Sequence, residues 1–151
     1  MTTRTDQHTA TGLDFLLTAK RAGGLGVGIG ETLGMNLGDI EDGRVVIEAS
    51  PGPEHGNPMG SVHGGYLATM LDGAMALAVQ TQVDVGTRFV TTDLNITYVK
   101  PVMPRAGVVY GTGSILHRGR TLALAEARIT DADGVLYAHA TGTFAISAPL
   151  I

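Results

Sequence analysis

Asp72 is the only ionisable side chain between Tyr66 and Val79, in the middle of the stretch HGGYLATMLDGAMALAVQTQ over residues 63–82. The pattern predicts a helix that is apolar on all sides and therefore buried. An ionised carboxylate in such a place is unfavourable unless it is paired, hydrogen-bonded or neutralised. Asp72 is therefore a candidate general base or nucleophile. The alternative is a structural carboxylate that accepts a hydrogen bond from a neighbouring hydroxyl or amide.

The first residues of the same helix could supply a complementary group. His63, Gly64 and Gly65 follow a loop rich in proline and glycine. The first amides of a helix are unpaired donors at the positive end of its dipole. The Gly64 N–H could therefore hold a carbonyl oxygen that gains negative charge. The alternative for both glycines is close packing at the start of the helix.

Gly64 and Asp72 are too far apart to act on one carbonyl group from one helix. They are eight residues apart in the sequence, which separates them by roughly 12 Å along a helix axis. Two antiparallel copies of the helix, related by a twofold axis, would bring Gly64 of one subunit near Asp72 of the other. The spacing thus predicts a homodimer with two shared sites.

The residues around this helix predict a short N-terminal helix and several antiparallel strands. Residues 14–22 have apolar residues at helical spacing and end before two glycines. Two strands are expected over residues 34–41 and 44–50, joined by a turn at Asp42-Gly43. A loop over residues 51–62 then leads into the long helix. Four more strands are expected after the helix, over residues 88–99, 107–116, 121–130 and 135–146. The short turns at 117–120 and 131–134 force antiparallel pairing.

Together these elements predict one α+β domain. A five- or six-stranded antiparallel sheet would wrap around the long central helix. A flexible tail over residues 1–11 is expected to precede a single domain over residues 12–151. Within residues 88–99, strict alternation would place Leu94 and Ile96 on the buried face and Thr91 on the opposite face.

Composition excludes several classes of protein. The chain has 151 residues, no cysteine and a net charge of −4, so we expect neither thiolate chemistry nor a nucleic-acid surface. The longest apolar run, residues 74–79, is far shorter than the roughly 20 residues of a membrane span. The polar N-terminus lacks the apolar run of a signal peptide, so a cytoplasmic location is expected.

Asn57, the triplet from His63 to Gly65, Asp72 and the strand VTTDLNITYVKP together resemble the hot-dog-fold acyl-CoA thioesterases. The similar branch contains the phenylacetic-acid-degradation thioesterases (PaaI-like), and the resemblance extends over residues 35–146. It implies a sheet wrapped around the central helix, assembly into a homodimer and, in many relatives, into a dimer of dimers. It also implies hydrolysis of an acyl-CoA to the free acid and coenzyme A, with no metal and no cofactor.

The resemblance also implies a role for each matching residue. Gly64 would polarise the thioester carbonyl through its amide, and Asp72 would act as base or nucleophile. Asn57 would position the carbonyl or the water, Thr91 would hydrogen-bond near the nucleophile, and His63 would orient the loop. Considered without the family, Asn57, Thr91 and His63 are each more readily interpreted as structural residues.

Two parts of the expected substrate need sites of their own. The turn HRGRT is similar to one that the family often uses for the nucleotide, so the resemblance implies Arg118 and Arg120, and next Arg88, as candidates for the coenzyme A phosphates. The guanidinium group suits phosphate geometry; the alternative is that these arginines are solvated surface charges. The acyl pocket is expected to use apolar residues such as Leu67, Met70, Leu71, Met75 and Phe89.

Two other functions compete with hydrolysis on this fold. A hydratase or dehydratase would be expected to carry an HFPG-like motif, which the sequence lacks. A non-catalytic acyl-CoA-binding protein would not need Asn57, Gly64 and Asp72 together. The sequence does not distinguish aryl from aliphatic acyl groups, water activation from a covalent anhydride, or a dimer from a tetramer.

Overall fold

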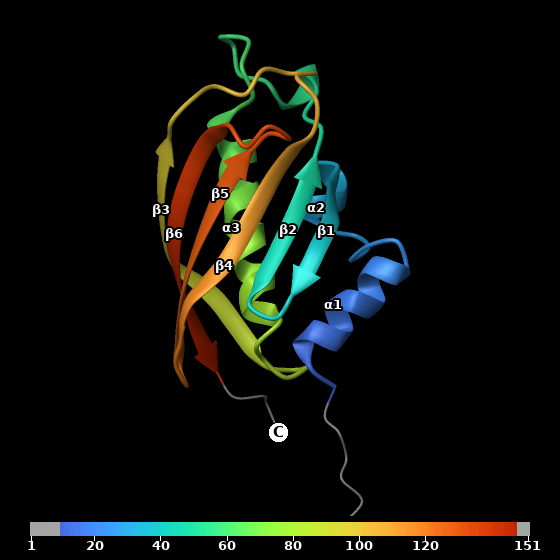
Figure 1. Ribbon diagram of the computed structural model, residues 1–151, viewed down its shortest axis with the longest axis vertical. Coiled ribbons are helices and arrows are strands. Elements are labelled where there is room, and N and C mark those ends of the chain that lie inside the picture. Colours follow the sequence, from blue (N-terminus) through green and yellow to red (C-terminus); the bar gives the residue numbers. More distant parts are fainter. Residues whose placement is uncertain (1–9, 148–151) are drawn as a thin grey trace, which may run out of the picture.

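The computed structural model describes residues 10–147, and it places one long helix across one face of a six-stranded antiparallel sheet (Figure 1). The helices are α1 (Gly12–Arg21), α2 (Ile29–Thr32) and α3 (Gly64–Gln80), with a 3₁₀ turn η1 at Pro53–His55. The strands are β1 (Met35–Glu41), β2 (Arg44–Ala49), β3 (Arg88–Tyr98), β4 (Val109–Arg118), β5 (Leu122–Thr130) and β6 (Leu136–Ser147). They lie in the order β1-β2-β4-β5-β6-β3, and every pair is antiparallel.

The predicted elements are all present, with ends that shift by one or two residues, so the predicted fold class is confirmed. The short elements α2 and η1 were not predicted, because each has too few residues to show a period. Most of the predicted tail, residues 1–9, lies outside the described residues. Its last residue, Thr11, is ordered: it caps α1 through its side chain and forms a bridge with Asp84.

Small residues on the sheet let α3 lie very close to its central strands. A Cβ atom on Gly113 of β4 would collide with the backbone carbonyl of Ala74. On Gly142 of β6 it would lie 3.1 Å from the Met75 side chain. Strand β5 presents the buried alanines 123, 125 and 127 to the same core. The close approach removes the methionine and leucine side chains of α3 from water and so provides most of the core.

Helix α3 is buried on one face only, so the prediction of a helix buried on all sides is wrong for the single chain. Met70, Leu71 and Met75 are completely buried against the sheet. Asp72 and Ala76, on the opposite face, are partly exposed. The sequence was misleading because this face consists largely of glycine, alanine and threonine, which do not interrupt an apolar pattern. We call it the open face of α3.

Strand β3 forms one edge of the sheet (Figure 1), and its alternation is broken by a β-bulge. Thr91 pairs with Phe144 and Asp93 pairs with Thr143, which leaves Thr92 as the extra residue. Residues that pair across antiparallel strands share a face, so Thr91, opposite the buried Phe144, and Leu94 both face α3. The predicted placement of Thr91 on the outer face is therefore wrong. Most of β3 is exposed, rather than buried on one face as predicted.

Among residues 10–147, no helix has the length and apolar character needed to cross a membrane.

Candidate active site

The carboxylate of Asp72 is held by a hydroxyl from the edge strand. Thr91 Oγ1 donates a hydrogen bond of 2.8 Å to Asp72 Oδ1. Within the described part of the chain, the other carboxylate oxygen, Oδ2, accepts no hydrogen bond. The pair lies on the open face of α3, where a substrate or a second chain could reach it. This arrangement suits a base or nucleophile, because one oxygen is oriented and the other is available.

The β-bulge in β3 makes this hydrogen bond possible. Without the extra residue Thr92, Thr91 could not face α3 together with Leu94. The Thr92 hydroxyl donates to the Thr143 carbonyl on the neighbouring strand at 3.2 Å, which fastens the bulge to β6. Bulges of this kind often turn a side chain toward a functional site.

The start of α3 presents an available amide. His63 is the N-cap residue, and its Nδ1 accepts a hydrogen bond of 2.8 Å from the Gly65 N–H. Because Nδ1 accepts this hydrogen bond, it carries no hydrogen of its own, and the His63 side chain caps the helix. Among residues 10–147 the Gly64 N–H has no hydrogen-bond acceptor. It lies at the positive end of the helix dipole, where it can bind a developing oxyanion.

The phenol of Tyr98 fixes the Gly64 peptide, a contact that the sequence interpretation missed. Tyr98 Oη donates a hydrogen bond of 2.8 Å to the Gly64 carbonyl. The ring packs so closely that a Cβ atom on Gly64 would lie 3.2 Å from Tyr98 Cζ. The signal in the sequence was only that Tyr98 belongs to the same face of the strand as Leu94 and Ile96. Nothing in the pattern indicated the start of α3 as its partner.

Asn57 holds together the loop that leads into α3. Its Oδ1 accepts hydrogen bonds from the backbone N–H groups of Met59 at 2.9 Å and Ser61 at 3.3 Å. Its Nδ2 donates to Ser61 Oγ at 2.9 Å. Asn57, Gly64 and Tyr98 line one pocket of about 290 Å³, which we call the amide pocket. The chain therefore brings Asn57 and Gly64 to the same pocket, with the Asn57 side chain engaged in its own loop.

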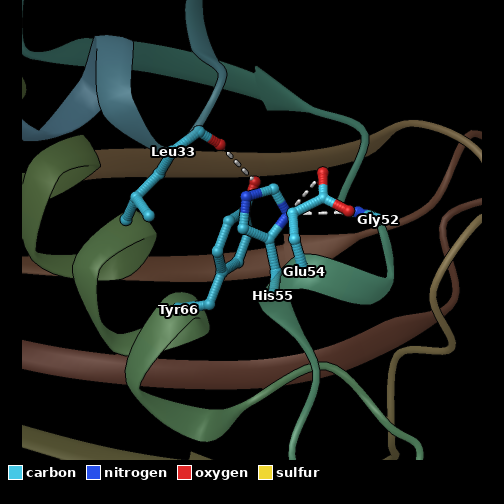
Figure 2. Close-up of polar contacts among 5 residues, drawn as sticks. All are labelled: Leu33, Gly52, Glu54, His55 and Tyr66. Atoms are coloured by element: carbon cyan, nitrogen blue, oxygen red, sulfur yellow. Dashed lines mark hydrogen bonds and ion pairs between the residues drawn. The ribbon is translucent and has the colours of Figure 1, made fainter.

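A tilted pair of aromatic rings in contact anchors this loop to the rest of the domain (Figure 2). The rings of His55 and Tyr66 lie 4.6 Å apart, and Tyr66 Oη donates to the Leu33 carbonyl at 2.9 Å. The backbone carbonyl of His55 accepts from the His63 N–H at 2.8 Å. Burial, and to a smaller extent the nearby Glu54 carboxylate, raise the pKa of the Tyr66 phenol, so it remains a neutral donor.

His55 uses its Nδ1 as an acceptor in the same anchor. The Gly52 N–H donates to this atom at 3.1 Å. Glu54 Oε1 also lies 3.8 Å from Nδ1 (Figure 2). An atom that accepts the Gly52 hydrogen has no hydrogen of its own to give to Glu54. The hydrogen bond from Gly52 therefore holds the ring in place, and the Glu54 contact is secondary.

The three candidate arginines lie at the end of the sheet where α3 finishes, away from Gly64. Arg88 begins β3, Arg118 ends β4, and Arg120 lies in the turn that joins β4 to β5. The Arg118 guanidinium donates to the carbonyl of Gly119. In one chain these arginines are therefore closer to the Asp72 half of the site than to the Gly64 half. Across residues 10–147, no group of three His, Asp or Glu side chains is placed to bind a metal ion.

Most of the residues expected to line the acyl pocket lie elsewhere in the structure. Met70, Leu71 and Met75 pack in the core under α3 and line neither pocket, so that prediction is wrong for them. Phe89 packs against the core and also lines neither pocket. Leu67 lines the amide pocket. A second pocket, of about 400 Å³, lies on the open face of α3 and uses none of these residues.

The fold defines the class of protein, a hot-dog domain, and solved structures share this fold. PaaI from the phenylacetic acid degradation operon of E. coli superposes with a TM-score of 0.80 at 19% identity, over 93% of this chain and 96% of that one. A putative thioesterase from Ralstonia eutropha JMP134, described as phenylacetic acid degradation-related, gives 0.76 at 26% identity, over 86% and 98% of the two chains.

Sequence relatives identify the family. The profile of the Thioesterase superfamily matches residues 59–138. Human acyl-coenzyme A thioesterase 13 is 34% identical over 102 residues, which are 67% of this chain and 71% of the relative. The chain belongs to the thioesterase superfamily, in its PaaI-like hot-dog branch, and is a thioester hydrolase.

The hydrogen bond from Thr91 to Asp72 leads to a prediction. We expect Thr91→Val to lower kcat for thioester hydrolysis by roughly tenfold to a hundredfold, because a hydrogen bond to a charged group contributes about 1.5–3 kcal/mol. Thr91→Ser, which keeps the hydroxyl, should recover most of the rate. Steady-state kinetics with a thiol reagent would measure both. A Thr91→Val enzyme with wild-type kcat would show that this bond does not serve the reaction.

Proposed function

We propose that this chain hydrolyses acyl-CoA thioesters to the free acid and coenzyme A. The observation that carries the proposal is the Asp72 carboxylate, oriented by Thr91 at 2.8 Å on a face of α3 that is open. Support for coenzyme A as the thiol comes from the 34% identity with a protein named for acyl-coenzyme A hydrolysis.

The proposed mechanism uses a backbone amide and a carboxylate. The Gly64 N–H polarises the thioester carbonyl and stabilises the negative charge on its oxygen as the tetrahedral species forms. Asp72 removes a proton from the attacking water, or attacks the carbonyl carbon directly to form an anhydride that water then cleaves. In both routes the carbon–sulfur bond breaks and coenzyme A leaves as a thiolate. Because a thiolate is a good leaving group, the site needs no strong general acid.

We further propose that each site is shared between two chains. Gly64 and Asp72 belong to the same continuous helix, and eight residues of helical rise separate them by roughly 12 Å. In the part of the chain that the structure describes, strand β3 leaves one sheet edge without a neighbour, and Val90, on its outer face, is 62% exposed. Antiparallel pairing of two β3 edges around a twofold axis would extend the sheet and turn the two open faces of α3 toward each other.

The same arrangement gives the arginines a role. Antiparallel pairing places the start of one β3 beside the end of the other. Arg88 of one chain would then approach the end of β3 at Tyr98, next to Gly64, in its partner. Arg88, Arg118 and Arg120 are proposed to bind coenzyme A phosphates from that position. Pairing of two dimers into a tetramer is a further proposal that rests on the family resemblance alone.

Replacement of the carboxylate tests the function. We expect Asp72→Asn to lower the rate of thiol release from acyl-CoA by roughly a hundredfold or more, because the amide cannot act as base or nucleophile. The assay should use phenylacetyl, hydroxybenzoyl, short and medium aliphatic thioesters. Asp133→Asn makes the same chemical change on an exposed turn and should leave the rate unchanged.

Each result of this assay has a clear meaning. A wild-type protein that cleaves none of the thioesters contradicts hydrolysis of acyl-CoA and favours a protein that only binds it. Equal activity of wild type and Asp72→Asn would make Asp72 a structural residue and contradict the mechanism.

A proline at position 64, which has no backbone N–H, tests the role of the Gly64 amide. We expect Gly64→Pro to lower kcat by roughly 100- to 1000-fold, as loss of an oxyanion donor does elsewhere. Gly64 is the first residue of α3, where proline is tolerated. The preceding residue, His63, has φ −62° and ψ 136°, the extended backbone that a following proline requires.

Gly64→Ala is the matched control for this substitution. It adds the same Cβ atom beside the Tyr98 ring, 3.2 Å from Cζ, but keeps the N–H. The difference in rate between the proline and alanine variants therefore reports the loss of the N–H donor together with the ring carbons that replace it. If the two variants have equal rates, and circular dichroism shows both to be folded, the amide is not the oxyanion donor.

A further inference from the structure

A glycine-rich segment, residues 23–31, forms one wall of the larger pocket. The pocket has a volume of about 400 Å³, and its other walls come from the open face of α3 and from strands β1 and β2. The lining includes Thr69, Gly73 and Ala76 of α3 and Leu25, Val27 and Ile29 of the segment. We call this cavity the chain pocket. Neither the family assignment nor the proposed mechanism gives it a role.

The chain pocket is adjacent to the proposed catalytic carboxylate. Thr69 and Ala76, which line the pocket, lie about one turn before and one turn after Asp72, and Gly73 follows it directly. On the other flank of the helix, Asp72 contacts Thr91 of β3. A thioester carbonyl at Asp72 would therefore have the pocket within reach on one side of the helix.

The lining favours an uncharged aliphatic ligand. The pocket walls are mostly aliphatic, and Val27 and Ile29 are 99% and 64% exposed, so they would lose unfavourable contact with water when an apolar group enters. Among the described residues, Glu31 is the one ionisable residue of the lining, and its charge would repel a carboxylate at the far end of an acyl group. Within residues 10–147, no aromatic side chain lines the pocket to pack against an aryl ring.

The backbone of the segment explains why the pocket is open. Gly23, Gly24 and Gly26 have positive φ values of 101°, 130° and 78°, which side chains other than glycine rarely adopt. The segment can thus turn without placing a side chain inside the cavity. A Cβ atom on Gly28 would meet nothing within 4 Å, and one on Gly30 would meet only the Met35 carbonyl at 3.9 Å.

We propose that the chain pocket holds the acyl group, and that the preferred acyl group is an unbranched aliphatic chain of medium length rather than an aryl or dicarboxylic one. A volume of about 400 Å³ corresponds to roughly a dozen water-sized groups, which suits a chain of about ten carbons. This assignment rests on the proposed acyl-CoA hydrolysis and names its substrate class.

Binding of thioethers tests the assignment without any hydrolysis. S-decyl-coenzyme A and S-ethyl-coenzyme A differ only in the length of the chain, and neither can be cleaved by water. Isothermal titration should give at least about a hundredfold tighter binding of the decyl compound to the wild-type protein. Equal affinity for the two compounds would overturn the assignment and mean that something else, such as a second chain, covers the pocket.

Two substitutions that fill the cavity from opposite walls sharpen the test. Ala76→Leu adds volume from α3, and Gly30→Leu adds it from the glycine-rich segment. Each should reduce the preference for decyl over ethyl by at least about tenfold. Ala132→Leu makes the same change as the first on an exposed turn and should leave the preference unchanged. If either pocket variant keeps the wild-type preference for the decyl over the ethyl compound, the substituted wall does not contact the acyl chain.

The outcomes separate this assignment from the proposed reaction. Loss of decyl preference in both variants, together with no hydrolysis of decanoyl-CoA by wild type, would support the pocket and contradict the reaction. Hydrolysis that is equally fast for acetyl-, decanoyl- and phenylacetyl-CoA, in wild type and variants alike, would support the reaction and contradict the pocket.

Discussion

The close contact between α3 and the small residues of the sheet determines the rest of the structure. Gly113 leaves no room for a side chain beneath Ala74, and the alanines of β5 continue the same surface. Because the sheet covers only one face of the helix, the opposite face is left open, and this face carries Asp72. The core and the candidate site are thus two faces of one helix. A bulky residue at Gly113 would lift α3 and move Asp72 away from Thr91.

Much of the fold could be predicted from local patterns, because the period of the apolar residues and the turn residues act over short distances. The long helix, the Asp42-Gly43 hairpin and the antiparallel strands after Gly86 all belong to this group. The exposure of the open face could not be predicted in this way. Alanine and glycine have the same effect on an apolar pattern whether they touch a sheet, a ligand or a second chain.

The candidate site was predicted as a set of residues, but not as an arrangement. Motif spacing indicated Asp72 and Gly64, and resemblance added Asn57 and Thr91. The bulge at Thr92 was missed because a single extra residue leaves no trace in an alternating pattern. Tyr98 was missed because its contact with the Gly64 carbonyl joins residues 34 positions apart. The chain pocket was missed for a related reason. Its walls come from α3 and from a glycine-rich segment more than 30 residues earlier in the sequence. A glycine in a sequence does not indicate a cavity until the fold shows what surrounds it.

Gly64 of one chain and Asp72 of another are proposed to act on the same carbonyl, and a mixed dimer would test this sharing. Chains carrying Gly64→Pro and chains carrying Asp72→Asn, each with a different affinity tag, can be expressed together and the mixed dimer purified through both tags. Each parent homodimer should be nearly inactive. A shared site predicts that the mixed dimer recovers about half of the wild-type rate, because one of its two sites combines an intact Gly64 with an intact Asp72. A mixed dimer as inactive as its parents would contradict the shared site.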